Sequence, residues 1–122
     1  MNKEFIPYEQ ALALKELGFD ESCFTHYLNK VLLTSSLVID KRERNSSFDD
    51  IRVTAPTYSQ AFRWFREKYQ LHNGIYPYYD EYEFQIKDFR LPTNTPINGG
   101  LMKYEEAELA CLIKLIEIVK KK

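Results

Sequence analysis

The closing stretch of the chain, residues 103–122, carries the strongest pattern in the sequence. Its apolar residues recur at steps of three and four, which places them on one face of a helix. That face is formed by Tyr104, Ala107, Cys111, Leu115 and Ile118, and it is widened by Leu112, Ile116 and Val119. Acidic residues come first and three lysines come last, which is the arrangement that the helix dipole favours. An apolar face of this width needs a body to cover it, so we expect the chain to fold around this helix.

Length and composition restrict the class of protein. A chain of 122 residues is expected to form one domain, and its 44% hydrophobic and 15% aromatic content is enough for a core. The net charge of −1 gives no general attraction to nucleic acid or to an acidic membrane. No apolar stretch reaches the length of a membrane span, and Cys23 and Cys111 stand outside any metal-binding spacing. We therefore expect a single domain over residues 1–122 in the reducing cytoplasm, without a membrane partner.

Two further helices are expected. The first covers residues 7–17, and Gly18 followed by Phe19 fits a Schellman cap in which Phe19 folds back onto Leu14. The second covers residues 57–71, where Thr57-Tyr-Ser-Gln has the form of a capping box. We expect His72-Asn-Gly74 to end this second helix.

Two hairpins are expected between the helices. Residues 23–34 contain β-branched and aromatic residues around Asn29-Lys30, which predicts two strands joined at that pair. Residues 75–89 alternate apolar and polar side chains, which predicts a second hairpin. Pro77 has no amide hydrogen to donate, so its strand is expected at the edge of a sheet.

Two loops complete the predicted fold. Residues 41–50 are charged and aperiodic, and we interpret them as a mobile loop. Residues 91–100 are rich in Pro, Asn and Gly, and we interpret them as a connecting loop. The sequence therefore predicts an α+β protein in which an antiparallel sheet from two hairpins packs against three helices, in the order helix, hairpin, helix, hairpin, helix.

The sequence contains no pattern typical of an enzyme. One hypothesis makes His72 a general base oriented by a nearby carboxylate, but no nucleophile or second base has an informative spacing from it. His26, the other histidine, lies among aromatic residues in a predicted strand. Metal-ligand spacings and a glycine-rich phosphate loop are absent from the sequence. We therefore expect no catalysis, no metal and no cofactor.

A tyrosine cluster gives the candidate protein interface. Tyr76, Tyr78, Tyr79 and Tyr82 gather around the end of the second hairpin. Alternation sends Tyr76 and Tyr78 to one face and Tyr79 to the other, so one core cannot cover all of them. Exposed tyrosines are typical of protein interfaces, although ordinary packing is the alternative explanation. The residues we select are Tyr76, Tyr79 and Tyr82.

A basic cluster gives the alternative, a nucleic-acid contact. Arg63, Arg66 and Lys68 lie on the second predicted helix beside Trp64, and surfaces of arginine and aromatic residues stack bases and bind phosphates. Acidic neighbours dilute this charge, so the competing explanation is a solvated helix face over an aromatic core.

Three blocks of the sequence resemble a known group of proteins. The blocks are Phe5–Phe19 (FIPYEQALALKELGF), Ala61–Tyr69 (AFRWFREKY) and Tyr104–Leu112 (YEEAELACL). They are similar to blocks of small uncharacterised proteins from phages and prophages of gut bacteria. The resemblance implies an origin in a mobile genetic element, and it implies no mechanism, since that family has no assigned activity.

Together these observations predict a non-catalytic protein-interaction module of a phage or prophage. It would bind through the tyrosine-rich hairpin or through the wide apolar face of the last helix, and its partner would be another protein or a second copy of the chain. A small nucleic-acid-binding accessory protein is the alternative, and an enzyme of unknown class is the third hypothesis.

Overall fold

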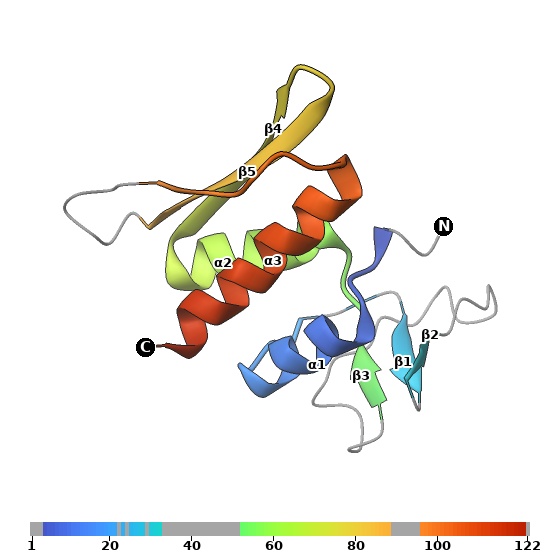
Figure 1. Cartoon of the computed structure of the whole chain (residues 1–122). Coiled ribbons are helices and arrows are strands. Elements are labelled where there is room, and N and C mark those ends of the chain that lie inside the picture. Colours follow the sequence, from blue (N-terminus) through green and yellow to red (C-terminus); the bar gives the residue numbers. More distant parts are fainter. Residues whose placement is uncertain are drawn as a thin grey trace. The chain divides into compact units, whose positions relative to one another are not determined.

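The structure, a computed structural model, describes residues 4–21, 23, 25–28, 30–32, 52–88 and 96–121. Within these residues it contains three helices and two antiparallel sheets of three strands each, so the predicted α+β class is confirmed (Figure 1). The chain divides into two compact units, Met1–Thr57 and Tyr58–Lys122. The prediction of a single domain over residues 1–122 stays a prediction.

The first unit contains one helix and one sheet. Its elements are α1 (Tyr8–Glu16), β1 (His26–Leu28), β2 (Val31–Leu32) and β3 (Arg52–Thr54). The strand order is β2-β1-β3, and α1 packs against β3. Tyr27 of β1 ties the segment before α1 to the sheet, because its hydroxyl donates a 2.7 Å hydrogen bond to the carbonyl oxygen of Ile6. Its ring also meets the edge of the Tyr8 ring, with the two centroids 5.5 Å apart.

The predicted end of the first helix is confirmed. Gly18 has φ 99°, in the left-handed region that glycine adopts without strain. The Phe19 amide donates to the Leu14 carbonyl at 2.9 Å, and the Gly18 amide donates to the Lys15 carbonyl at 3.1 Å. These two bonds are the Schellman pattern, and both Phe19 and Leu14 are buried.

The first predicted hairpin is confirmed, and one strand joins it that was not predicted. Leu28 of β1 stands opposite Val31 of β2, which leaves two positions for the turn. On the other side of β1, Tyr27 pairs with Val53 of β3. A three-residue strand gives too short a pattern to identify from sequence, because its pairing depends on a distant partner. The predicted mobile loop, residues 41–50, lies outside the described residues.

The second unit is a three-stranded sheet covered on one side by two helices (Figure 1). Its elements are α2 (Tyr58–Tyr69), β4 (Leu71–Tyr78), β5 (Glu81–Asp88), β6 (Ile97–Asn98) and α3 (Tyr104–Lys120). Both helices pack on the β4–β5 hairpin and on each other. Its buried apolar residues are Tyr58, Ala61, Trp64, Phe65, Leu71, Phe84, Ile86, Ala107, Cys111, Leu112, Leu115, Ile116 and Val119.

The predicted end of the second helix is wrong. The helix ends at Tyr69, Gln70 takes a left-handed φ of 57°, and β4 begins at once with the fully buried Leu71. His72-Asn-Gly74 therefore belongs to a strand and does not end the helix. This left-handed residue is not a glycine, so no residue type in the sequence marks the end of the helix at Gln70.

The predicted second hairpin is present and longer than expected, and Pro77 is confirmed in an edge strand because the strand order is β4-β5-β6. The connecting loop predicted over residues 91–100 is wrong at Ile97–Asn98, which form a strand. These residues form β6, and the Gly99 amide donates to the Phe84 carbonyl at 2.9 Å. Positions 91–95 lie outside the described residues. The predicted order of alternating helices and hairpins is not confirmed. The strands form two separate three-stranded sheets instead of one, and each sheet contains a strand outside the two hairpins.

The last helix has the predicted apolar face. Most residues of that face are buried, whereas Tyr104 at its start is exposed. The Lys103 amide, which precedes the helix, donates a 3.0 Å hydrogen bond to Glu106 Oε1, so a first-turn carboxylate satisfies one open amide. Among the described residues, no helix has the length and apolar character needed to cross a membrane.

Candidate protein interface

The β4–β5 hairpin has one covered face and one open face. Residues alternate between the faces along each strand, and the register pairs Leu71 with Asp88 at one end and Tyr78 with Glu81 at the other. Phe84 and Ile86 lie on the covered face and are buried. The open face carries His72, Gly74, Tyr76 and Tyr78 from β4, and Glu81, Glu83, Gln85 and Lys87 from β5.

The hairpin turns through only two residues, Tyr79 and Asp80. Tyr79 has φ 56°, a left-handed conformation that glycine usually supplies in such turns. A bulky residue held there stores strain on the order of 1 kcal/mol or more. The strained position therefore presents a large aromatic side chain at the point of the hairpin where packing does not need one.

The tyrosines at this end of the hairpin are exposed. The exposed fraction is 91% for Tyr79, 51% for Tyr78 and 48% for Tyr76. The Tyr78 and Tyr79 rings meet edge to face with centroids 4.8 Å apart, so they form one aromatic surface and not two separate side chains. Single exposed apolar residues are common on proteins, but adjoining aromatic rings point to a contact site.

Acidic residues surround these rings. Asp80 and Glu81 are exposed, and Glu83 is half-buried opposite Tyr76. No lysine or arginine occurs between residues 69 and 86 of the sequence. We call the following residues the tip surface: Tyr76, Tyr78, Tyr79, Asp80, Glu81 and Glu83.

The structure separates Tyr82 from the other two predicted interface residues. Tyr82 lies on the covered face, opposite Pro77, and its ring meets the edge of the Tyr104 ring at a centroid distance of 5.2 Å. Its backbone also exchanges hydrogen bonds of 2.8 and 2.9 Å with Met102. Tyr82 thus joins the hairpin to the start of α3. Tyr78, which the sequence analysis did not select, lies on the open face with Tyr76. The alternation of the strand was the signal that could have selected Tyr78 from the sequence.

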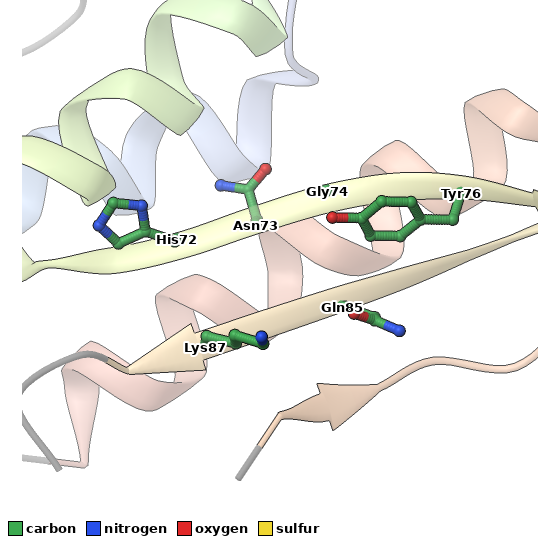
Figure 2. Close-up of a pocket in the computed structure, with 6 residues that line it drawn as sticks. All are labelled: His72, Asn73, Gly74, Tyr76, Gln85 and Lys87. Carbon is green, nitrogen blue, oxygen red and sulfur yellow. The ribbon is translucent and has the colours of Figure 1, made fainter. Parts of the chain in front are cut away.

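A shallow polar depression occupies the other end of the open face (Figure 2). It has a volume of about 310 Å³ and is lined by His72, Asn73, Gly74, Tyr76, Gln85 and Lys87. The Tyr76 ring lies along β4 with its hydroxyl end at Gly74 (Figure 2). A Cβ atom at Gly74 would come within 2.5 Å of that hydroxyl, so glycine is what lets the ring lie flat. Asn73 stands opposite Ile86, on the covered face, and its side-chain Nδ2 is buried there without a hydrogen-bond partner among the described residues.

The basic residues proposed for nucleic acid lie on the exposed side of α2. Arg63, Arg66 and Lys68 are all exposed, as the helical pattern predicted. The Lys68 ammonium stands 5.3 Å from the Trp64 ring centre and 5.8 Å from that of Tyr69. Because Trp64 is itself buried, its ring already serves the core and offers little surface on which a base could stack.

The remaining reactive side chains form no recognisable centre in the described part of the chain. Burial, with a smaller effect of the Glu108 charge, raises the pKa of the Cys111 thiol to about 12, which keeps it protonated and unreactive. Cys23 is also a buried free thiol. No three His, Cys, Asp or Glu side chains gather in a way that could hold a metal ion, as far as the described residues show.

Comparison with known protein families, with characterised proteins and with solved structures finds no match to this chain.

Proposed function

We propose that the protein is a non-catalytic protein-interaction module and that the tip surface is its binding element. The observation that carries this proposal is Tyr79, which is held in a strained left-handed conformation with 91% of its surface exposed. Strain and exposure of an aromatic ring both oppose stability, so the residue is best explained by a contact made outside the chain.

The physical basis of binding is the rigidity of the hairpin. Eight residue pairs hold β4 and β5 in register up to the turn, so the rings of the tip surface are presented on a fixed backbone. Tyrosine has few rotatable bonds and a large contact area, which makes it a frequent centre of binding energy. Little conformational entropy is therefore lost when a partner covers these rings.

The test is a selection from a random displayed peptide library against the wild-type protein, followed by counter-selection on Tyr79→Ser. We expect peptides that bind the wild type and lose at least about tenfold in affinity on Tyr79→Ser, the loss typical of a central interface tyrosine. The matched control is Ile113→Ser, which alters an apolar residue exposed to 43% on α3, and it should leave binding unchanged. If no selected peptide distinguishes Tyr79→Ser from wild type, the proposal is wrong.

The origin and setting of the protein are part of the proposal. The resemblance of its helices to phage and prophage proteins supports an origin in a mobile element, and two free cysteines are compatible with a reducing cytoplasm. The genes that flank the coding sequence test the origin, because phage structural or replication genes should surround it.

Nucleic-acid binding is kept as the alternative, because Arg63, Arg66 and Lys68 are exposed on one helix. Fluorescence anisotropy with single- and double-stranded DNA and RNA at low salt tests it. We expect affinities no tighter than the non-specific range of roughly 10⁻⁴–10⁻⁶ M. Submicromolar, salt-sensitive binding that Arg63→Ala with Arg66→Ala abolishes would replace the leading proposal with this one.

A further inference from the structure

The charges of the tip surface restrict what can bind there. Three carboxylates, those of Asp80, Glu81 and Glu83, accompany the exposed rings, and no lysine or arginine of the hairpin lies near that end. The basic residue of the open face, Lys87, stands opposite His72 at the far end, beside the polar depression. A cation approaching the open face is therefore drawn to the tip surface and repelled from the depression.

The register of the hairpin arranges the rings and carboxylates in pairs. Tyr78 stands directly opposite Glu81, and Tyr76 stands directly opposite Glu83. Side chains opposite each other in an antiparallel pair have Cβ atoms about 4.5–5.5 Å apart, so each of these tyrosines has a glutamate as its neighbour across the strands. The Tyr76 ring itself lies along β4 toward Gly74, which leaves its face open to a partner (Figure 2). A guanidinium group can stack on a tyrosine ring and donate two parallel N–H hydrogen bonds to a carboxylate, which makes arginine the side chain that fits such a pair best.

The two pairs also have a defined spacing. They are two residues apart on each strand, which corresponds to about 6.6–6.8 Å. Side chains on one face of an extended peptide repeat at the same distance. We propose that the tip surface binds an extended segment of a partner protein that carries basic residues, preferably arginine, at alternating positions. This inference rests on the proposed function and names the chemistry of its partner.

Other occupants explain the surface less well. Nucleic acid would bring phosphates against three carboxylates, which repel them. A second copy of the chain could offer the basic residues of α2, but there Arg63 and Arg66 follow a helical spacing and the Lys68 ammonium already lies over two rings. Self-association is therefore an outcome that the test must distinguish.

The test uses four synthetic peptides of equal length. The first is Gly-Thr-Arg-Thr-Arg-Thr-Gly, with alternating arginines, and the second is its isomer Gly-Thr-Thr-Arg-Arg-Thr-Gly. The third and fourth replace both arginines of the first peptide with citrulline, which has the same shape without the charge, or with glutamate. Binding is measured from the shifts of backbone amide NMR signals of the tip surface during titration.

We expect the alternating arginine peptide to bind most tightly and to shift the amides of Tyr78, Glu81 and Glu83. Citrulline and adjacent arginines should each weaken binding by at least about threefold, since each removes part of a charge-assisted contact, and glutamate should abolish it. Raising the salt to about 300 mM should weaken the arginine peptide more than the citrulline peptide.

Variants of the protein locate the contact. Glu81→Gln with Glu83→Gln should remove the preference for arginine over citrulline while leaving the hairpin folded, because both side chains reach solvent. Glu67→Gln with Glu105→Gln, two exposed glutamates of α2 and α3, removes the same two charges elsewhere and should keep that preference. Equal binding of arginine and citrulline peptides by the wild type would overturn the inference.

The outcomes of the two proposals are distinct. If the library yields peptides that depend on Tyr79 but lack basic residues, the protein is an interaction module and only this inference fails. If light scattering shows a dimer that both Tyr79→Ser and Arg66→Ala dissociate, the tip surface binds a second copy and this inference is also overturned. If no peptide depends on Tyr79, both proposals fail together.

Discussion

Tyr79 and Gln70 share a left-handed backbone conformation, but the fold requires that conformation in different ways at the two positions. Both have a left-handed φ, 56° at Tyr79 and 57° at Gln70. At Gln70 the conformation ends α2 and directs the chain into β4, so the fold explains it. At Tyr79 it completes a tight turn that glycine or asparagine would make with less strain. The side chain at Tyr79 is thus retained at a loss of stability, which is the pattern expected of a binding residue.

The first prediction follows from this strain. Tyr79→Gly should leave the stability of the protein unchanged or raise it by up to about 1 kcal/mol, because glycine adopts this turn conformation freely. Tyr78→Gly, one position earlier in a regular strand, should lower stability by about 1 kcal/mol. Urea unfolding of the two variants provides the comparison. A clear loss of stability in Tyr79→Gly would show that the tyrosine supports the fold.

The second prediction compares two glycines. A methyl group at Gly74 meets the hydroxyl end of Tyr76, which is half-exposed and free to move, so Gly74→Ala should change stability by less than about 1 kcal/mol. A methyl group at Gly99 overlaps the buried ring of Phe84, so Gly99→Ala should destabilise the protein by roughly 1–3 kcal/mol. Thermal melts of both variants check this order, and the reverse order would contradict the packing described for β6.

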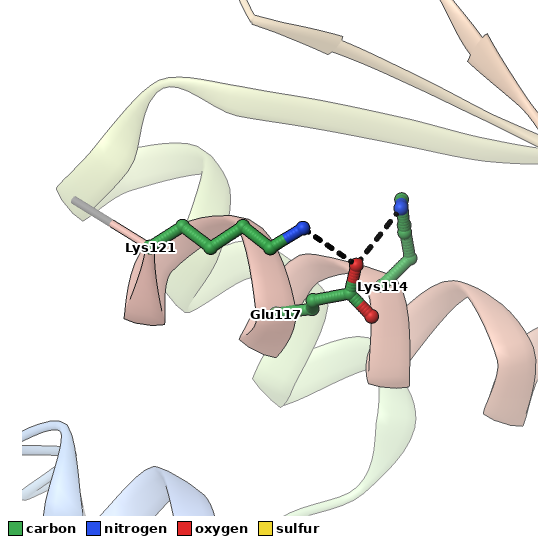
Figure 3. A network of polar contacts seen from close by, with 3 residues as sticks. All are labelled: Lys114, Glu117 and Lys121. Atoms are coloured by element: carbon green, nitrogen blue, oxygen red, sulfur yellow. Dashed lines mark hydrogen bonds and ion pairs between the residues drawn. The ribbon is translucent and has the colours of Figure 1, made fainter.

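At the scale of elements, α3 is the part of the fold that the sequence predicts best. Its apolar period is long and regular, and the acidic and basic residues that the sequence places at its two ends lie in its first and last turns. Exposed side chains on its outer face form one small network, in which Glu117 accepts hydrogen bonds from Lys114 at 3.0 Å and Lys121 at 3.3 Å (Figure 3). Such pairs support a helix weakly, whereas the buried face fixes it to the sheet.

The third prediction separates these two faces. Leu115→Asp puts a carboxylate at a fully buried position of α3 and should destabilise the protein by about 3 kcal/mol or more. Ile113→Asp makes a similar change on the same helix at a residue that is 43% exposed, and it should alter stability by less than about 1 kcal/mol. Thermal unfolding followed by circular dichroism measures both. An unchanged midpoint in Leu115→Asp would exclude the assigned core.

The fourth prediction concerns pH. Hydrogen bonds from Lys114 and then Lys121 lower the pKa of Glu117 below its ordinary value of 4.5. A carboxyl whose pKa is lower in the folded state adds stability above its unfolded pKa, and this stability is lost as the pH falls through the folded pKa. Wild type should therefore melt slightly above Glu117→Gln at neutral pH, and the two should melt together once the pH has fallen below the lowered pKa of Glu117. A difference that persists in acid, or one that high salt leaves intact, would show that the ion pairs are not its cause.

The elements that sequence did not predict have a common physical cause. The two missed strands, β3 and β6, contain three and two residues, and only their partners in space make them strands. The end of α2 depends on one left-handed residue with an ordinary side chain. At the candidate site, the tyrosine cluster was visible in the sequence, but the pairing of Tyr76 with Glu83 and of Tyr78 with Glu81 required the register of the hairpin. Periodic local patterns are thus predictable from sequence, and pairings between distant segments are not.

At the scale of the whole molecule, the length of the chain predicts one unit that unfolds cooperatively, whereas its internal contacts divide it into two. A chain of 122 residues is expected to unfold as one domain, yet its contacts form two compact units that meet in sequence at Thr57 and Tyr58. The binding element proposed here lies wholly in the second unit. Whether the first unit is needed for binding therefore depends on whether the two units unfold together.

The fifth prediction is that they do, in one cooperative transition. Each unit has its own reporter, because the sole tryptophan, Trp64, is buried in the second unit and Cys23 is buried in the first. The variant Cys111→Ser leaves Cys23 as the only thiol. Trp64 fluorescence and the thiol reactivity of Cys23 should then change at the same urea concentration, since small single domains unfold without populated intermediates. If Cys23 became reactive while Trp64 fluorescence stayed native, the chain would consist of two domains, and the peptide titrations could be repeated on residues 58–122 alone.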